Sequence, residues 1–313
     1  MTRTPDAVLL IAFGGPDTPE DVRPFLANVT RGGPIPAARI AEVAHHYELI
    51  GGRSPLNELT FRQADLLRAR LQGEGLPLPV YVGMRNWTPY LSETLAVMAA
   101  DGMRSAVGLI LSAHQTEASW GRYQENVAEA RGRVGAGAPE VRYAPASFDR
   151  PGFVAAMADR VRAAFEAIPP AARAATPLVF TAHSVPVPMA EASPYVAQVI
   201  ESSRCVAERL GHVRWSVVYQ SRGGRPEDPW LAPDIGDELR RLAAAGARRV
   251  VVAPIGFVCD HVEVLYDLDV EARRIAAAQG IGFHRALTVG DHPAFISMLA
   301  DLVREEVVLS GRA

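Results

Sequence analysis

Short apolar runs alternate with amphipathic stretches along most of this chain. Six runs rich in valine, isoleucine and leucine have the length of buried strands: 7–14, 78–84, 106–113, 177–184, 215–221 and 249–257. Six stretches between them carry alanine, arginine and glutamate at helical spacing: 20–29, 58–72, 90–102, 151–168, 193–211 and 234–246. The alternation predicts an α/β fold in which helices connect the strands of a parallel sheet.

The two halves of the chain repeat the same order of segments. Three residues in each half correspond at a constant offset: Leu95, Gly102 and Arg104 in the first, Leu239, Gly246 and Arg248 in the second. Each glycine follows a predicted helix, where a left-handed backbone is common. We predict two similar Rossmann-like, doubly wound parallel-sheet domains, 1–147 and 148–313, with a cleft between them. The alternative is one large α/β sheet whose units look alike by chance.

Composition narrows the class of protein. The 313 residues carry 32 Lys and Arg against 35 Asp and Glu, so a large basic surface for nucleic acid is not expected. Two cysteines, Cys205 and Cys259, exclude a disulfide framework and any iron–sulfur cluster held by four cysteines of this chain. The apolar runs are far shorter than the ~20 residues that span a bilayer. We expect a cytoplasmic protein with no transmembrane segment or nucleic-acid partner, acting as a monomer.

Common cofactor and nucleophile motifs are missing from the sequence. The first apolar run leads into AFGGPDTPED, which lacks the G-x-G-x-x-G dinucleotide fingerprint. The chain also lacks a G-x-x-x-x-G-K-[ST] phosphate loop and a G-x-S-x-G nucleophile elbow. A dehydrogenase, a P-loop NTPase and an α/β-hydrolase are therefore disfavoured.

Polar residues follow several predicted strands, where open parallel sheets bind their ligands. They are 14–16, 114–115, 183–184, 220–221 and 259–261. His183 alone is compatible with either hydrogen-bonded scaffolding or a ligand role. Residues 259–263 also contain a cysteine, a histidine and two carboxylates, but neighbours along the chain rarely converge on one zinc ion.

An acidic row is more informative. Glu263, Asp267 and Glu271 recur every four residues, so a helix places them on one face. They could form a solvated face that is compensated by Arg273 and Arg274. The apolar residues around them favour partial burial, and a buried acidic row requires a cation or protons. Carboxylates suit divalent cations, and imidazole suits Fe(II) or zinc.

Five motifs, in this order, resemble those of the ferrochelatase family, which inserts Fe(II) into a porphyrin. They are LIAFGGP (10–16), YELIGGRSPLNE (47–58), TAHSVP (181–186), YQSRGGRPEDPWLAPDI (219–235) and GFVCDHVEVLYDLD (256–269). The resemblance implies that His183 and Glu263 are the catalytic pair, which coordinates the incoming iron and accepts the pyrrole protons. Asp267 and Glu271 would continue the metal path. Fe(II) is then a substrate, and no prosthetic group or iron–sulfur cluster is expected.

The compact chain is similar to the bacterial coproporphyrin III ferrochelatases. The residues that match the substrate-binding positions of this subgroup are Phe13, Arg31, His46, Tyr47, Ser54 and Tyr123. Some family members have a tyrosine at the position of Phe13, which could ligate product iron, whereas phenylalanine cannot. The alternatives are the same reaction on protoporphyrin IX, a non-catalytic porphyrin or haem carrier, and a small chelatase acting on a sirohydrochlorin-type macrocycle.

Overall fold

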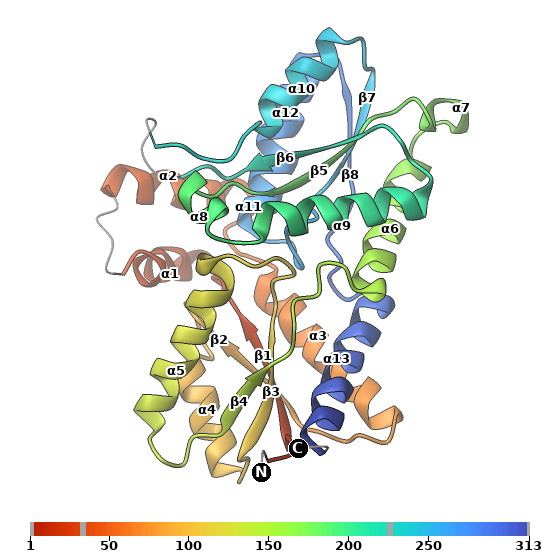
Figure 1. The fold of residues 1–313 in the computed structure, drawn as a ribbon. Helices are drawn as coiled ribbons and strands as arrows, with labels where there is room; N and C mark the ends of the chain where they lie inside the picture. The colour runs from red at the N-terminus through yellow and green to blue at the C-terminus, as the bar shows by residue number, and fades with distance from the viewer. Residues whose placement is uncertain (1–2, 32–35, 224–227, 312–313) are drawn as a thin grey trace. The chain divides into compact units, whose positions relative to one another are not determined.

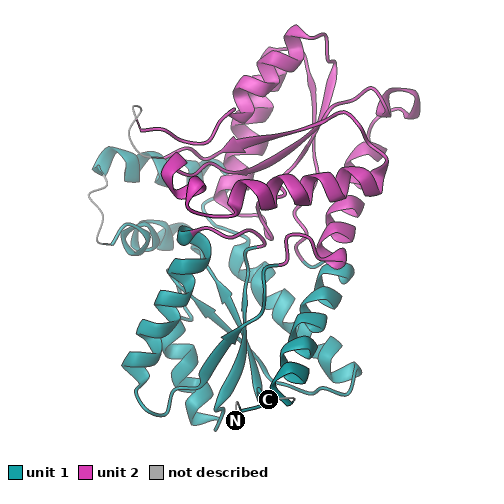
Figure 2. Cartoon of the chain, viewed as in Figure 1, with its two compact units in different colours: residues 1–112, 117–146, 291–313 teal, residues 113–116, 147–290 magenta. Residues whose placement is uncertain are grey.

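A computed structural model describes residues 3–31, 36–223 and 228–311. It contains two parallel four-stranded sheets, each within its own compact unit (Figures 1 and 2). Unit 1 comprises residues 1–112, 117–146 and 291–313, and unit 2 comprises residues 113–116 and 147–290. The alternative of a single large sheet is therefore wrong.

The strand order is the same in both units. In unit 1 it is β2-β1-β3-β4, formed by Val80–Met84, Ala7–Ala12, Ser105–Ile110 and Glu140–Tyr143. In unit 2 it is β6-β5-β7-β8, formed by Trp215–Gln220, Leu178–His183, Arg249–Ala253 and Gly282–Arg285. All six predicted strands are present, and the edge strands β4 and β8 were not predicted. The shared order confirms that the halves are alike.

Helices cover both faces of each sheet. Unit 1 contains α1 (Val22–Val29), α2 (Ala37–Leu49), α3 (Leu56–Gly73), α4 (Leu91–Ala100), α5 (Arg122–Val134) and α13 (Pro293–Gly311). Unit 2 contains α6 (Pro151–Glu166), α7 (Pro170–Arg173), α8 (Val187–Glu191), α9 (Tyr195–Leu210), α10 (Ile235–Ala244), α11 (Val262–Val264) and α12 (Arg273–Ala278). None of the helices among the described residues is both long and apolar enough to cross a bilayer.

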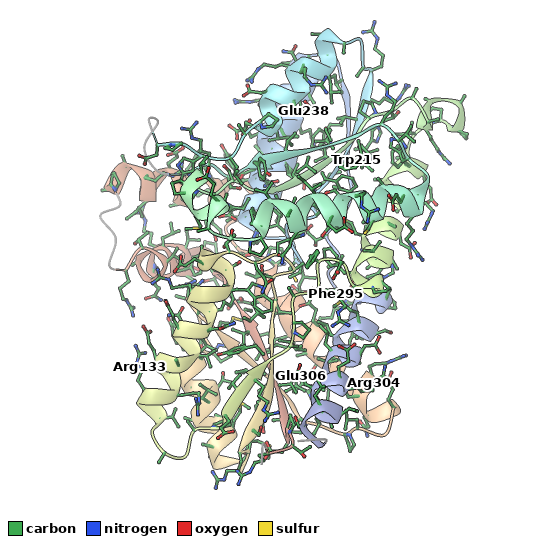
Figure 3. All side chains as sticks on the ribbon, in the orientation of Figure 1. Arg133, Trp215, Glu238, Phe295, Arg304 and Glu306 are labelled. Carbon is green, nitrogen blue, oxygen red and sulfur yellow. The ribbon has the colours of Figure 1, made fainter. Side chains whose placement is uncertain are left out.

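The C-terminal helix differs from the predicted domain division. Residues 148–313 were expected to form the second domain, but 291–313 belong to unit 1, where α13 packs on α3 and β3. Phe295 is buried there, and Arg304 Nη1 lies 2.7 Å from Glu74 Oε2 at the end of α3 (Figure 3). The apolar face of α13 thus completes the core of the first unit, which the order of segments along the chain could not reveal.

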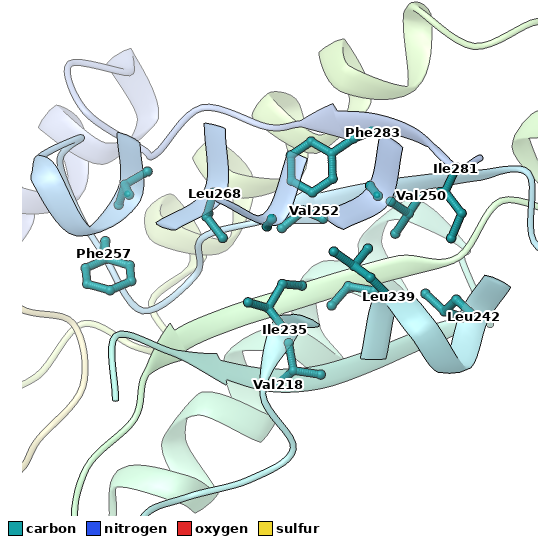
Figure 4. Close-up of a cluster of buried hydrophobic side chains, with 14 residues drawn as sticks. Val218, Ile235, Leu239, Leu242, Val250, Val252, Phe257, Leu268, Ile281 and Phe283 are labelled. Atoms are coloured by element: carbon teal, nitrogen blue, oxygen red, sulfur yellow. The ribbon is translucent and has the colours of Figure 1, made fainter. Parts of the chain in front are cut away.

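One apolar cluster in unit 2 supports the acidic segment. Leu268, Ala272 and Ala276 are fully buried against Leu239 of α10 and Val250 of β7 (Figure 4). Burial of these side chains holds the segment 262–278 on the sheet, since apolar burial stabilises by about 25 cal/mol per Å². The polar residues of the segment are left at its other face.

Gly102 and Gly246 end α4 and α10 with the same left-handed backbone, φ 83° in each case. We expect Gly102→Ala to destabilise the protein by about 1–2 kcal/mol, because a Cβ is disfavoured at this φ. Gly132 lies inside α5 with open space at its Cβ position, so Gly132→Ala is expected to stabilise by about 0.5–1 kcal/mol. Urea unfolding of both variants measures the difference, and effects of the same sign would contradict it.

Candidate active site

His183 is the last residue of β5, and the register of the sheet places it beside Gln220, the last residue of β6. The Tyr195 hydroxyl donates to the backbone oxygen of His183 at 2.9 Å. Gly256 allows the loop after β7 to pass close by, because a Cβ there would lie 2.7 Å from Ala182. The carboxyl ends of three parallel strands thereby meet around one imidazole.

The hydrogen bonds of His183 determine its tautomer. Its Nδ1 is bonded to the Ser184 carbonyl oxygen, which can only accept, so Nδ1 carries a hydrogen. In the neutral ring the lone pair is therefore on Nε2, which lies 3.5 Å from Glu263 Oε1. The two side chains remain 34% and 39% exposed. A half-buried imidazole thus faces a carboxylate, with Nε2 available for a proton or a metal ion.

Electrostatics favours a shared proton in this pair. Burial opposes the charged form of His183, but the facing Glu263 carboxylate and the bond to Ser184 outweigh it and raise the pKa of His183 to about 9. At neutral pH the imidazole holds a proton beside the carboxylate. Any dication that approaches this position would repel that proton.

Glu263 is anchored through its backbone. It lies in α11, and its carbonyl oxygen accepts a hydrogen bond of 2.6 Å from Gln220 Nε2. The second carboxylate oxygen, Oε2, is 3.7 Å from His261 Nε2. The end of β6 therefore positions the backbone that carries the carboxylate opposite His183.

Asp267 lies farther along the same segment. Ser221, the residue after β6, donates its hydroxyl to Asp267 Oδ2 and has a positive φ of 62°. Burial, together with the negative charges of Glu263 and Glu271, raises the pKa of Asp267 to about 7. Glu271 is exposed. The predicted acidic row thus extends from the half-buried Glu263 to an exposed carboxylate.

Asp267 and Glu271 lie on a π-helix that follows α11, rather than on one continuous α-helix as predicted. The π-helical turns span Leu265–Ala272, and the N–H of Arg273 donates to the carbonyl oxygen of Leu268, five residues earlier. The four-residue spacing of Glu263, Asp267 and Glu271 in the sequence does not distinguish the two helix types. Among the described residues, no group of three or more histidine, cysteine, aspartate or glutamate side chains is gathered closely enough to hold a metal ion.

The remaining predicted residues lie in unit 1. Phe13 follows β1, and its ring packs edge-on against Phe25, with the guanidinium of Arg85 5.6 Å from the Phe13 ring. The same guanidinium lies 4.5 Å from the ring of the buried Tyr123. The buried Tyr47 also packs edge-on against Phe25. The structure therefore links Phe13 with Tyr47 through Phe25, and with Tyr123 through the guanidinium of Arg85.

The polar residues among the predicted substrate-binding positions do not contact these aromatic rings in the interactions described above. Arg31 is exposed after α1, and its Nη2 donates to Asn28 Oδ1 at 2.5 Å. Burial lowers the pKa of His46 on α2. Ser54 is buried, and its N–H donates to the Pro16 carbonyl oxygen at 2.9 Å. Residues 224–227, within the fourth motif, lie outside the described residues.

Two features around the site were missed from the sequence. The hydroxyl of Tyr195 supports His183 from α9, and Arg285 at the end of β8 pairs with Asp260 and Asp269. No short motif indicates these contacts, because the partners are 12, 16 and 25 residues apart along the chain. The strand-end pattern did, however, indicate His183, Gln220, Ser221 and Asp260.

Solved structures with a similar fold are chelatases. The SirB protein of Bacillus subtilis with Fe³⁺ has a TM-score of 0.61 at 11% identity, covering 97% of this chain and 96% of that one. The sirohydrochlorin chelatase SirB of Bacillus subtilis subspecies spizizenii, in complex with cobalt, has a TM-score of 0.56 at 10% identity, covering 96% and 95%. The fold is thus chelatase-like.

Comparison of sequences narrows this class. A family model described as Ferrochelatase matches residues 5–307. The chain is 44% identical to a ferrochelatase of Rhodopirellula baltica over 96% of its length and 86% of that protein. It is 46% identical to the coproporphyrin III ferrochelatase of Mycobacterium leprae, covering 96% and 89%, and 45% identical to that of Streptomyces griseus, covering 98% and 87%. The chain belongs to the ferrochelatase family, the metal-inserting lyases of haem biosynthesis.

Behind Tyr195 lies a buried histidine that makes unit 2 sensitive to acid. His114 is 1% exposed, its Nε2 is 2.9 Å from Ser202 Oγ, and burial lowers its pKa from 6.5 to about 3. The unfolded chain therefore binds a proton below pH 6.5 that the folded chain does not bind until about pH 3. The stability that neutral His114 contributes is present above pH 6.5 and is lost as the pH falls from 6.5 towards 3.

We expect this one residue to lower the free energy of unfolding by about 2 kcal/mol between pH 7.5 and pH 5. His114→Gln retains a polar partner for Ser202 but has no titrating ring. Its free energy of unfolding, measured by urea titration, is expected to fall less over the same interval than that of the unsubstituted protein. Parallel losses in the two proteins would contradict the assignment.

Proposed function

We propose that this chain inserts Fe(II) into coproporphyrin III, with His183 and Glu263 as the catalytic pair. The observation that carries the proposal is the 3.5 Å separation of His183 Nε2 and Glu263 Oε1 at the carboxyl end of the unit 2 sheet. Support for the substrate comes from the names of the relatives in Mycobacterium leprae and Streptomyces griseus.

The chemistry requires two operations at one place. A porphyrin must lose two pyrrole N–H protons as it gains a dication. The Glu263 carboxylate can accept a proton directly. The imidazole of His183 can do so once the proton that it holds at neutral pH has left Nε2, and both side chains are then suitable Fe(II) ligands. The two side chains face each other from two anchored backbones, so their atoms are held in place before the substrate arrives. Iron is shared in this scheme between these side chains and the porphyrin nitrogens.

Asp267 and Glu271 connect the pair with solvent. Asp267, with a pKa of about 7, changes its charge easily near neutral pH, and Glu271 is exposed. A row of carboxylates of this kind attracts a hydrated dication at its exposed end. The same row accepts the protons that leave in the opposite direction. In this scheme Asp267 and Glu271 carry metal ions and protons without contacting the macrocycle.

Unit 1 supplies the contacts with the porphyrin in this proposal. The half-buried Phe13 offers aromatic surface, and the buried Tyr47 and Tyr123 pack on its neighbours Phe25 and Arg85. Arg31 and His46 offer polar groups for propionates. A guanidinium matches a carboxylate with two parallel hydrogen bonds, which makes Arg31 the main propionate partner. Neither Cys205 nor Cys259 forms a disulfide in the described part of the chain, which fits a reducing cytoplasm. We propose that the protein acts there as a monomer without a prosthetic group.

Substrate preference tests the proposed porphyrin. Coproporphyrin III has four propionates and protoporphyrin IX has two, so kcat/KM is expected to be at least about tenfold higher for coproporphyrin III in anaerobic Fe(II) insertion followed by absorbance. Arg31→Gln should narrow this preference, whereas Arg39→Gln, which removes an exposed helix pair with Glu42, should not. Preference for protoporphyrin IX would reverse the assignment, and porphyrin binding without acceleration would indicate a carrier.

The pair itself is tested by substitution. We expect His183→Ala and Glu263→Gln each to lower kcat by about 10²–10⁴-fold, as loss of a general acid–base group does, while porphyrin binding measured by fluorescence persists. His212→Ala is the matched control, because this histidine packs on Phe165 before β6, away from the carboxyl ends of the strands. Full activity of the His183→Ala protein would refute its catalytic role.

A further inference from the structure

A buried ionic cluster lies beside the acidic row. Arg285 Nε is 2.9 Å from both carboxylate oxygens of Asp269, and its Nη2 is 2.8 Å from Asp269 Oδ2. The same Nη2 is 3.1 Å from Asp260 Oδ2, and Nη1 is 3.3 Å from Asp260 Oδ1. Side-chain exposure is 8% for Arg285 and 14% for Asp260. All three guanidinium nitrogens are therefore engaged, with one carboxylate on each side.

The two carboxylates lie on either side of Glu263 and Asp267 along the chain. Asp260 is in the turn before α11, ahead of Glu263, and Asp269 is in the π-helix, just beyond Asp267. Arg285 belongs to β8, where its backbone pairs with Val252 of β7. One side chain on the sheet thus binds both ends of the segment that carries Glu263 and Asp267.

A guanidinium, rather than an ammonium, suits a position between two carboxylates. Its planar fork presents donors on two edges, so it can bind two carboxylates at once, whereas a lysine ammonium is a single point charge. The burial of the cluster makes the arrangement specific, since removing one partner leaves a charge without compensation. Arg273 adds a second cation to Asp269, at 3.1 Å, but from the π-helical segment's own continuation rather than from the sheet.

We propose that Arg285 is a positioning residue that holds Glu263 at the correct distance from His183. The inference rests on the proposed site, because it assigns to Arg285 an effect that acts through Glu263. Without the guanidinium, the segment 260–269 keeps its apolar anchors but loses its ionic connection with β8. We expect loss of the guanidinium to impair iron delivery and proton removal. Porphyrin binding, which is assigned to unit 1, should be unaffected.

The test is a double-mutant cycle between Arg285→Lys and Glu263→Gln in Fe(II) insertion into coproporphyrin III. We expect Arg285→Lys to lower kcat at least about tenfold and to raise KM for Fe(II), with KM for the porphyrin unchanged. In the Glu263→Gln background the same substitution should have little further effect, because residues that act as a unit are not additive. Asp269→Asn keeps the volume of the side chain and the Arg285–Asp260 pair. It should lower kcat and raise KM for Fe(II) in the same way as Arg285→Lys, but to a smaller extent.

Arg241→Gln is the matched control. Arg241 also makes a two-pronged pair with a buried carboxylate of unit 2, at 2.7 Å and 2.8 Å from Glu238. That pair adjoins Ser216 near the start of β6, at the opposite end of the strand from Gln220. We expect Arg241→Gln to lower stability in urea and to leave both KM values and kcat unchanged.

The outcomes separate the two proposals. Loss of activity in Glu263→Gln with unchanged kinetics in folded Arg285→Lys and Asp269→Asn proteins would overturn the positioning role and leave the catalytic pair standing. Additive losses would also overturn it, because they would show that Arg285 acts independently of Glu263. Unchanged kinetics in Glu263→Gln would overturn the site and the positioning role with it.

Discussion

The parallel pairing of β5 between β6 and β7 is the constraint on which the site of unit 2 depends. Because the three strands run in one direction, their carboxyl ends lie together, and His183, Gln220 and the loop leading to Glu263 meet there. The approach is close enough that Gly256 is required beside Ala182. Each later feature, from the tautomer of the imidazole to the backbone anchor of Glu263, follows from this register.

Unit 2 contains two kinds of buried carboxylate: some are paired with a cation, and others are not neutralised in this way. In the Arg285 cluster the carboxylates are neutralised by a guanidinium, which fixes them in place. In the acidic row Asp267 accepts a hydrogen bond from the hydroxyl of Ser221, and burial together with the charges of Glu263 and Glu271 raises its pKa to about 7. The first arrangement provides rigidity, and the second leaves negative charge available for ions that arrive and depart. Because the two arrangements are close along the chain, the fixed Arg285 cluster supports the backbone of the acidic row, whose charge can change.

Much of the fold could be predicted from the sequence. Buried parallel strands are continuous apolar runs, so β1, β2, β3, β5, β6 and β7 were evident, and the left-handed glycines marked the ends of α4 and α10. The edge strands β4 and β8 were missed because they are short and only partly buried. The π-helix was missed because its hydrogen-bond pattern leaves little trace in residue spacing. Assignment of α13 to unit 1 depends on long-range packing that periodicity does not encode.

The sequence also indicated some residues of the candidate site and missed others. His183 and Glu263 were found from strand ends, the acidic row and family motifs, and the structure brings them together. The partner of Asp260 could not be found, since Arg285 lies on an unpredicted strand far along the chain. Tyr195 was missed for a different reason: it lies on a predicted helix, but a tyrosine in an amphipathic helix has no local sign of its hydrogen bond to His183.

The position of α13 also has a consequence for synthesis on the ribosome. Unit 1 begins with the first strand of the chain but lacks its last helix until residues 293–311 have emerged, after all of unit 2. The nascent first unit therefore exposes the apolar faces of α3 and β3 throughout most of translation. The second unit, which apart from residues 113–116 is one continuous stretch, can complete its core earlier. The unit that is made first is thus the one that matures last.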